Sequence, residues 1–545
     1  MSPDTELREL GLRVPEIEES RWPRRLRSPL GPLRRLRAWF WHHRQSLPLV
    51  GLLLLTVGVV QAWGMTRSPA PVDDEGTYVA QAWAVQTQHR LAHYTYWYDH
   101  PPFGWIQLSL WTWITDAFHR VSHAVFAGRE AMLLAGLISA GLVFVISRRL
   151  GLPRWAAAIA VLAFGLSPLA VSMHRMVYLD NIAVPWVLAA FALALSPRRS
   201  LWAAAASGLC FAAAVLSKET FLLLLPALVW QLWQHCDRRT RAFCLTALAS
   251  VLALALTVYP LYALLKGELL PGRGHVSLLN AVGFQLFSRA SSGAVLGANT
   301  PAHHTVAGWL AIDSWLFYAG LVLLPFGFVV RRTRPVAAAL TIQFLMLVRG
   351  GYLPGPFVIG MLPFAALLIA GLVGAAWGGT EGWRSITTVG RRLAVAAAIG
   401  LALVLVLPHW WQGDRAQMTQ PASASWAAAE GWVERNVPRD QRLIVDDTMW
   451  VDLVDHGFPK QLGVVWFYKL DSSNNLDPSV ARRLPGGWRQ FGYIISTPNM
   501  RSSVQDMPNG LVPVREALAN STVAAKFGAG NDLVEVRQIN PQATP

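Results

Sequence analysis

The sequence predicts a polytopic α-helical membrane protein followed by a small α/β domain. Of the 545 residues, 53% are hydrophobic and only 14% are charged, whereas a soluble chain has about 25% charged residues. The hydrophobic residues form uninterrupted blocks, which is the pattern of membrane-spanning helices. Beyond residue 411, short apolar runs alternate with polar segments, as in a soluble domain. This composition excludes a disordered protein, a coiled coil and an ordinary cytosolic enzyme.

We expect eleven membrane spans. The apolar blocks lie at residues 47–65, 131–147, 155–173, 182–196, 201–217, 220–235, 242–265, 306–330, 336–348, 352–376 and 393–411. Several are shorter than the ~20 residues of a straight span, so flanking residues must complete them. The Trp-rich stretch 103–118 has Thr, Ser and Gln among its apolar residues, which favours an interfacial helix over a twelfth span.

The distribution of basic residues sets the orientation. With eleven spans, the inner loops hold 14 basic residues in 39 positions and the outer connections hold 10 in 125. A twelfth span would reverse this bias against the positive-inside rule. Residues 21–45 contain eight arginines and no acid, lack a cleavable signal and suit a cytoplasmic surface of anionic lipid. We therefore predict a multi-pass plasma-membrane protein with a cytoplasmic N-terminus and an extracytoplasmic C-terminal domain.

The chain thus divides into three regions. These are an Arg-rich cytoplasmic tail (1–45), a transmembrane domain that includes outer loop 66–130 (46–411), and an extracytoplasmic α/β domain (412–545). In the last domain we expect strands at 442–447, 463–467, 493–496, 522–527 and 533–538, and helices at 426–435, 449–455 and 512–520. The net charge of +15 invites a nucleic-acid partner, but residues 412–545 balance 13 basic with 14 acidic residues. We expect membrane lipids and no nucleic acid as partners. The three cysteines lie in or beside apolar blocks, so no disulfide framework is expected.

Ionisable residues gather in the outer connections. They are Asp73, Asp74, Glu75, Asp99 and His100 in the first outer loop, then Arg175 and Asp180, Lys218 and Glu219, and finally Arg349 with the neighbouring Tyr352. A transporter would place such groups near the bilayer midplane, and here only Asp313 lies within a predicted span. Each group also has a simpler interpretation, such as a helix cap, an exposed ion pair or an arginine that reaches lipid phosphate. Their convergence on one membrane face favours an active site.

Four of these segments resemble motifs of the GT-C glycosyltransferases over about residues 45–410. Residues 74–78 (Asp-Glu-Gly-Thr-Tyr), followed by Gln-Ala-Trp at 81–83, resemble the D-E motif after the first span of the protein O-mannosyltransferases and of the lipid A aminoarabinose transferase. Residues 99–104 resemble the mannosyltransferases' H-P-P-L-G-K, with Phe103 for Leu and Trp105 for Lys. Arg175 with residues 179–181 is similar to R…L-D-S. Residues 352–354 with Pro363 are similar to the aminoarabinose transferase's late tyrosine and prolines.

The resemblance implies a GT-C type fold and a phospholipid-carrier-dependent hexosyl- or pentosyltransferase. Such enzymes move a monosaccharide, with inversion, from a polyprenyl-phosphate donor to an acceptor hydroxyl of a lipid, glycan or protein outside the membrane. Asp74 matches the family's catalytic aspartate, and a single displacement needs such a carboxylate to take the acceptor proton. Glu75 and Asp180 are then expected to orient the acceptor or the base, and His100 and Tyr352 to bind substrate. The growing phosphate charge needs cations, for which Arg175, Lys218 and Arg349 are the candidates.

Two questions stay open from the sequence. Adjacent carboxylates at Asp73, Asp74 and Glu75 are also suited to holding a divalent cation such as Mg²⁺ or Mn²⁺ through oxygen ligands. The alternative function is a transporter or flippase of a lipid-linked sugar, and a third is a membrane anchor that presents the C-terminal domain. An anchor needs no outward cluster of carboxylates, and a transporter would favour midplane charges.

Overall fold

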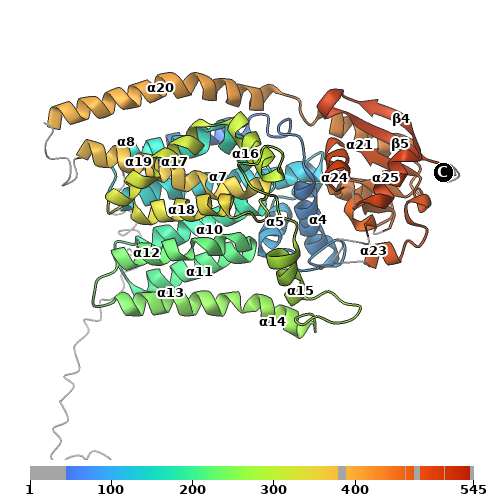
Figure 1. Cartoon of the computed structure of the whole chain (residues 1–545), viewed down its shortest axis with the longest axis horizontal. Coiled ribbons are helices and arrows are strands. Elements are labelled where there is room, and N and C mark those ends of the chain that lie inside the picture. The colour runs from blue at the N-terminus through green and yellow to red at the C-terminus, as the bar shows by residue number, and fades with distance from the viewer. Residues whose placement is uncertain (1–43, 379–387, 461, 472–478, 508–509, 541–545) are drawn as a thin grey trace, which may run out of the picture. The chain divides into compact units, whose positions relative to one another are not determined.

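The computed structural model describes residues 44–378, 388–460, 462–471, 479–507 and 510–540. Nearly all of the predicted Arg-rich tail and part of the predicted inner loop 377–392 therefore lie outside the described residues. Residues from Val50 to Pro545 form one compact unit, separate from the residues before them. This unit holds the helices and the sheet seen in Figure 1.

The region before residue 420 is helical, and every predicted apolar block lies in one or two helices. The α-helices are α3 (Leu47–Ala62), α4 (Asp73–Gln88), α5 (Phe103–Ile114), α6 (Ala117–Arg120), α7 (Ala124–Arg149), α8 (Arg154–Leu166), α9 (Pro168–Arg175), α10 (Leu179–Ala194), α11 (Leu201–Ser217), α12 (Leu225–His235), α13 (Arg241–Leu256), α14 (Val258–Leu265), α15 (Leu278–Gly283), α16 (Pro301–Ile312), α17 (Trp315–Val329), α18 (Arg334–Val348), α19 (Leu362–Gly378) and α20 (Thr388–Thr419). Shorter helical turns are η1 (Glu219–Leu224), η2 (Phe284–Ser288) and η3 (Gly355–Gly360). Helices α10, α11 and α13 pack side by side (Figure 1).

Several of these helices are long and apolar enough to cross a membrane. Within the described part of the chain there are four, at Ala124–Arg149, Arg241–Leu265, Gly355–Gly378 and Thr388–Asn436, or up to six if two bent pairs each count as one span. Five further apolar helices are shorter, so the count of eleven spans remains a prediction. Helix α5 has 12 residues, which at ~1.5 Å per residue is about 18 Å and too short for a ~30 Å hydrocarbon core.

Both bent pairs have a local cause. Helices α8 and α9 meet at 59°, where the Ser167 hydroxyl accepts a hydrogen bond from the N–H of Ala170 and Pro168 starts the new helix. Helices α16 and α17 meet at 105° around the buried Asp313. One carboxylate oxygen of Asp313 accepts the N–H of Trp315, and the other accepts the Ser167 hydroxyl at 2.6 Å. Asp313, which the sequence placed within a span, therefore lies at the end of α16, and its carboxylate connects the bend between α16 and α17 to the bend between α8 and α9.

The C-terminal region contains a five-stranded sheet with helices around it. Its elements are α21 (Ala424–Asn436), β1 (Leu443–Val445), α22 (Trp450–Asp455), β2 (Val464–Trp466), α23 (Ser479–Arg482), β3 (Tyr493–Ser496), α24 (Pro498–Asp506), α25 (Val512–Ala519), β4 (Ser521–Phe527) and β5 (Val534–Ile539), with the short turns η5 (Asp447–Met449), η6 (Phe467–Leu470), η7 (Gly487–Gln490) and η8 (Gly530–Asp532). The strand order is β2-β1-β3-β5-β4. Strand β1 is parallel to β2 and β3, whereas β5 is antiparallel to β3 and β4.

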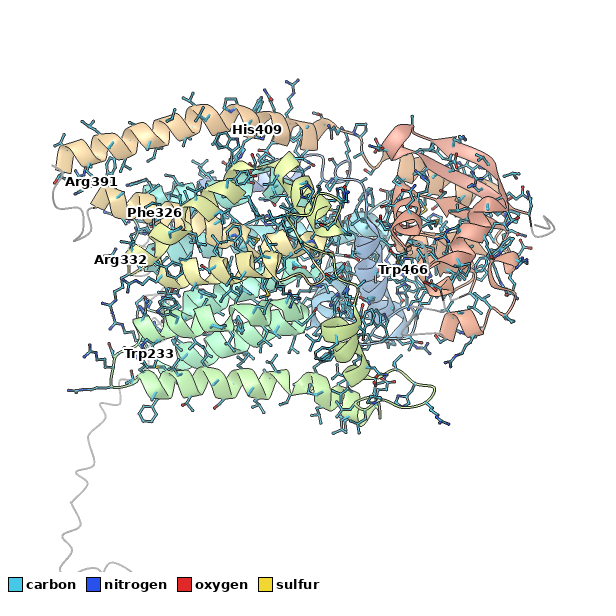
Figure 2. All side chains as sticks on the ribbon, in the orientation of Figure 1. Trp233, Phe326, Arg332, Arg391, His409 and Trp466 are labelled. Carbon is cyan, nitrogen blue, oxygen red and sulfur yellow. The ribbon has the colours of Figure 1, made fainter. Side chains whose placement is uncertain are left out.

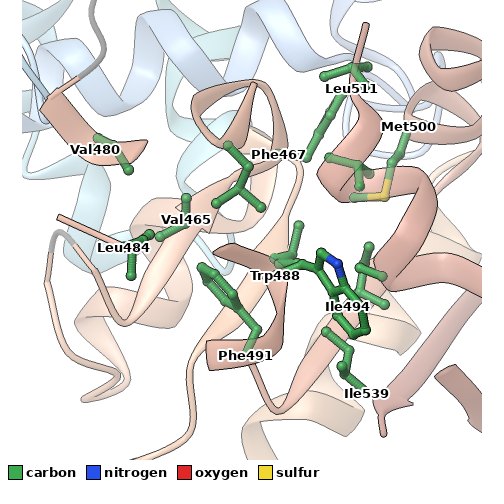
Figure 3. Packing of buried hydrophobic residues seen from close by; sticks show 14 residues of the cluster. Val465, Phe467, Val480, Leu484, Trp488, Phe491, Ile494, Met500, Leu511 and Ile539 are labelled. Carbon is green, nitrogen blue, oxygen red and sulfur yellow. The ribbon is translucent and has the colours of Figure 1, made fainter. Parts of the chain in front are cut away.

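An apolar core covers this sheet. Ile444 of β1 pairs with Val465 and Ile494 on the flanking strands, and all three are fully buried. Phe467, Trp488 and their neighbours close over them (Figure 3). The carboxyl end of β1 carries Asp446 and Asp447, so the sheet presents its polar edge at the end of its central parallel strands.

Basic residues of the predicted inner loops lie away from this sheet. Arg332 and Arg391 are at one end of the helices in Figure 2, and Trp466 of β2 is at the other. That the sheet and the arginine loops lie on opposite sides of a membrane stays a prediction.

Candidate active site

The three acidic residues of the D-E segment form the first turn of α4. Carboxylates suit a helix N-terminus because its free N–H groups carry partial positive charge, and Glu75 Oε1 accepts the N–H of Val72, the helix cap, at 3.3 Å. Successive residues of a helix point about 100° apart. Asp73, Asp74 and Glu75 therefore face three different surroundings.

Glu75 is fully buried and paired. Its two oxygens accept hydrogen bonds from Arg129 of α7 at 2.7 and 3.0 Å, and Oε2 also accepts the N–H of Val177 at 2.9 Å. The Arg129 guanidinium has no exposed surface either and donates further bonds to the carbonyls of Met65 and Pro69. These contacts fasten α4 to α7 and to the turn before α10, which is a positioning role for Glu75.

Asp73 faces the C-terminal sheet. Its carboxylate accepts the N–H of Asp447 at 3.1 Å and the indole N–H of Trp466 at 2.8 Å. Burial, and then the charges of the acids that end β1, raise the pKa of Asp73 well above its ordinary value. Next to it, a Cβ at Gly76 would come within 2.1 Å of the Thr448 nitrogen. Helix α4 thus docks backbone to backbone on the sheet's polar edge.

Asp74 is the exposed member of the three. Its carboxylate makes no hydrogen bond or ion pair with any residue that the structure describes. Burial is the largest cause that raises the pKa of both Tyr78 and Tyr178, and the negative charge of Asp74 is the next largest. Asp74 is therefore an open carboxylate beside two buried phenols.

His100 forms the centre of a charged cluster. Its Nδ1 lies 3.0 Å from Glu219 Oε2, and its Nε2 lies 3.0 Å from Lys218 Nζ. An ammonium only donates and a carboxylate only accepts, so a neutral His100 carries its hydrogen on Nδ1. Burial raises the pKa of Glu219, but the neighbouring His100 and Lys218 charges outweigh it and lower the pKa to about 2. Glu219 is therefore ionised at neutral pH and holds the imidazole toward Lys218.

The backbone around His100 is also fixed. The His100 carbonyl accepts the hydroxyl of Tyr96 at 2.7 Å and that of Tyr259 at 3.3 Å. Pro101 and Pro102 restrict the chain before α5 begins at Phe103. The H-P-P segment therefore presents the imidazole from a rigid turn.

Side chains from three outer connections meet around Tyr78. Burial is the largest cause that raises the pKa of this phenol well above its ordinary value, and the charges of four carboxylates raise it further. These are Asp74 of α4, Asp99 of the H-P-P turn, Asp180 at the start of α10 and Glu219 at the start of η1. Asp180 is buried. One oxygen of Asp99 is also buried and has no hydrogen-bond partner among the described residues. The structure therefore brings Asp74, Asp180 and the Lys218 cluster into one neighbourhood.

Arg175 does not fit the predicted phosphate-binding role. All five of its N–H groups donate to backbone carbonyl oxygens, those of Val60, Gln61, Trp63, Ser68 and Gln417. The side chain is 2% exposed. With every donor used, Arg175 fastens α9 to the end of α3 and to α20, and no N–H is left for a ligand.

Arg349 and Tyr352 lie on a neighbouring loop. Arg349 is exposed and has no hydrogen bond or ion pair with the described residues. The guanidinium of Arg289 lies over the ring of Tyr352, with its central carbon 3.5 Å from the ring centroid. Arg289 donates to Gln285 at 2.6 Å, and Gln285 donates to the backbone carbonyl of Asp99 at 3.3 Å. This chain of contacts connects Tyr352 to the H-P-P turn.

The predicted cation site of three adjacent carboxylates does not form as a cluster. The oxygens of Asp73 and Glu75 accept N–H donors in opposite surroundings, which leaves only Asp74 with free oxygens. Among the residues that the structure describes, three ligand atoms converge at a different place, between His123, Glu430 and Asp452.

A cavity of about 1030 Å³ lies beside this region and is lined mainly by residues 89–96, Tyr262, Lys266 and Arg482. Tyr96 belongs both to its wall and to the contacts that hold His100. Asp74, Lys218 and Asp180 are not among its lining residues, so the cavity adjoins the charged cluster and does not contain it.

Comparisons with known proteins give the fold. The family model for dolichyl-phosphate-mannose-protein mannosyltransferase matches residues 99–262. ArnT from Cupriavidus metallidurans bound to undecaprenyl phosphate has a TM-score of 0.56 at 16% identity, over 91% of this chain and 98% of that one. The apo oligosaccharyltransferase of Archaeoglobus fulgidus has a TM-score of 0.51 at 12% identity, over 86% and 70%. AglB of that organism, in complex with an inhibitory peptide and a dolichol-phosphate, has a TM-score of 0.51 at 13% identity, over 86% and 71%. No curated protein sequence gave a match.

The chain has the GT-C glycosyltransferase fold.

The matched segment of this GT-C chain holds part of the site. His100, Asp180 and Lys218 fall within residues 99–262, whereas Asp74 and Tyr352 fall outside them. The D-E segment is therefore brought to the matched segment by the fold, through Glu75 and Arg129.

Sequence reasoning missed several residues around the candidate site. Burial, and then the charges of Asp74 and other nearby acids, raise the pKa of Tyr78 and Tyr178, and Arg289 covers Tyr352. Tyr96 and Tyr259 hold the H-P-P turn. The two tyrosines of the D-E and R…L-D segments stand inside quoted motifs, which was a usable signal. Nothing in the sequence pairs Arg289 with Tyr352.

Proposed function

We propose that the chain is an inverting glycosyltransferase that moves a monosaccharide from a polyprenyl-phosphate carrier to an acceptor hydroxyl at the outer face of the membrane. The fold supports this, since the similar ArnT structure is bound to undecaprenyl phosphate and the similar AglB structure to a dolichol-phosphate. The family model that matches residues 99–262 is likewise that of a lipid-phosphate-sugar enzyme. Relatives with this fold differ in sugar and acceptor, and the proposal leaves both open.

The observation that carries the proposal is the open carboxylate of Asp74, one turn of α4 before Tyr78, whose ring centroid lies 6.2 Å from that of His100 in the charged cluster. An inverting displacement needs one base to remove the acceptor proton as the sugar carbon is attacked. Asp74 is exposed and free of described partners, so it is available to accept that proton. Asp180 lies in the same neighbourhood and is proposed to orient the acceptor. Glu75 supports the base by fixing α4 through Arg129.

The departing phosphate is assigned to Lys218. Negative charge grows on the carrier phosphate in the transition state, and preorganised cations stabilise it. Lys218 Nζ has three N–H groups, of which one donates to His100. His100 and Glu219 therefore hold the ammonium in place with donors to spare. Arg349 is proposed as a second, solvent-facing cation, and Tyr352 as a substrate contact beside it.

Reconstituted membranes test this function. The full-length protein in vesicles is given radiolabelled undecaprenyl-phosphate mannose, and other undecaprenyl-phosphate sugars in turn, with membrane extract as acceptor. We expect ATP-independent transfer of label with release of undecaprenyl phosphate. Label that crosses the bilayer still attached to its carrier would instead support the flippase alternative and overturn the proposal.

A further inference from the structure

Three metal-ligand side chains converge away from the proposed active site. His123 immediately precedes α7, Glu430 lies on α21 and Asp452 lies on α22. One ligand atom from each lies within 4.8 Å of the other two. His123 Nδ1 and Glu430 Oε2 are 2.9 Å apart. The segments are distant in the sequence, so the fold alone brings these groups together.

The cluster is buried, and its central carboxylate has no hydrogen bond. Glu430 is 0% exposed, and neither of its oxygens makes a hydrogen bond with the described residues. The contact with His123 Nδ1 is short but lacks hydrogen-bond geometry. A buried carboxylate without a partner is costly, and proteins compensate such groups by pairing them or by coordinating a metal. Glu430 therefore points into the group with only the His123 imidazole and the Asp452 carboxyl beside it, and with no hydrogen bond of good geometry among the described residues.

The neighbouring groups orient the other two ligands. Asp452 accepts the N–H of Ala124 at 2.9 and 3.2 Å, which leaves lone pairs free on both oxygens. Burial, and then the charge of Glu430, raise the pKa of Asp452 well above its ordinary value. The rings of Phe126 and Trp426 pack against His123, with centroids 5.2 and 4.9 Å away. The imidazole is thereby held toward the carboxylates, as supporting contacts hold the ligands of metal sites.

We propose that His123, Glu430 and Asp452 bind a divalent transition-metal ion, with zinc as the best match. One imidazole nitrogen and two carboxylate oxygens are zinc ligands, and three protein ligands leave the fourth tetrahedral position to water. Ligand atoms on one tetrahedral zinc lie about 3.3 Å apart. Side-chain rotations would therefore have to bring the three ligand atoms, now within 4.8 Å of one another, to that separation. Calcium and magnesium favour all-oxygen shells with more ligands, whereas an imidazole favours zinc and its neighbours.

A metal here joins parts of the fold that the active site also depends on. The ion would connect the start of α7, which carries Arg129, to two helices of the C-terminal region. Helix α4 docks on the same region through Asp73 and Gly76. The ion would therefore link these elements, and its binding does not depend on the proposed transfer reaction.

Metal analysis of the full-length protein tests the site. Protein purified in detergent on a tag without histidine is stripped with a chelator, reloaded with Zn²⁺ and passed through a desalting column. We expect about one Zn²⁺ per chain by mass spectrometry of the metal. At ~100-fold excess over its Kd, Zn²⁺ should also raise the unfolding temperature by roughly 2 °C. Co²⁺ in its place should give the intense visible absorption of a four-coordinate ion.

Matched variants identify the ligands. Glu430→Gln and Asp452→Asn keep the side-chain shape and should reduce Zn²⁺ affinity at least ~10-fold. Glu434→Gln is the control, because this residue lies one turn further on α21 and pairs with His456. The proposal is overturned if the wild-type chain retains no stoichiometric Zn²⁺ and gives no Co²⁺ absorption, since the carboxylates would then be neutral acids sharing protons. Equal Zn²⁺ affinity in wild type and Glu430→Gln would overturn it as well.

Discussion

Replacing Arg129 by Met tests whether Glu75 positions α4. The substitution keeps an unbranched apolar stem but removes four hydrogen bonds, two to the Glu75 carboxylate and two to the carbonyls of Met65 and Pro69. Both charged side chains are fully buried. Breaking a buried ion pair by removing one partner costs about 3–5 kcal/mol, because the remaining charge is left without compensation.

The double substitution separates the ion pair from its parts. Removing both charges costs much less than removing one, because neither is then left buried alone. We therefore expect Arg129→Met to lower the unfolding temperature by roughly 3–4 °C, and Glu75→Gln combined with Arg129→Met to recover part of that loss. Tryptophan fluorescence of the detergent-solubilised protein during heating measures each shift. An unchanged unfolding temperature in Arg129→Met, or strictly additive losses, would refute this account of Glu75.

Three further predictions concern the donor, pH and topology. Lys218→Ala should weaken undecaprenyl phosphate binding and turnover by ~10–100-fold at normal expression, as expected for one charge-assisted contact, and Arg349→Ala should have a smaller effect; unchanged kinetics in both would remove them from the donor site. Because its pKa is lowered in the fold, the pairing of Glu219 stabilises the protein fully above the unfolded-state pKa of about 4.3, and this stabilisation is lost as pH falls through about 2. The difference in unfolding temperature between wild type and Glu219→Gln should therefore shrink between these two pH values. A constant difference would contradict the pairing. In a cysteine-free background, a cysteine that replaces the exposed Thr66 should react with a membrane-impermeant thiol reagent added outside. A cysteine that replaces the exposed Thr240 should react only when the reagent is inside. The reverse pattern would overturn the eleven-span topology.

The sequence predicted the helices well because hydropathy is a local property. Every apolar block is helical, and the strands lie in the expected apolar runs. Helix α24 (Pro498–Asp506) was missed because its residues are mostly polar and carry no apolar stripe. The break at Asp313 was also missed, since its partner Ser167 is far away in the sequence.

The site was predicted by residue type more successfully than by residue role. The charges of Asp74, Asp180 and Glu219 all act on Tyr78, and the charge of Lys218 acts on Asp180, as expected for residues on one face, while their roles stay predictions. Arg175 was assigned to phosphate because a motif cation looks the same in sequence whether it faces a ligand or backbone carbonyls. The three carboxylates of the D-E segment looked like one cluster, but helical rotation separates Asp73 and Glu75 from Asp74. Contacts between distant segments, such as His123 with Glu430, leave no local signal.

The most direct test of the proposed function is the transfer rate of Asp74→Asn. The amide keeps the shape of the side chain but takes up no proton near neutral pH, so transfer from undecaprenyl-phosphate sugar should slow by about 10²–10⁴-fold while undecaprenyl phosphate binding persists. Asp116→Asn is the matched control, since Asp116 is an exposed carboxylate of the same outer loop whose one ion pair among the described residues is with the exposed His119. Asp73 is unsuitable because it holds the C-terminal region. The account predicts a large loss for Asp74→Asn and none for Asp116→Asn. Near-normal transfer by Asp74→Asn would contradict it and move the base role to Asp180.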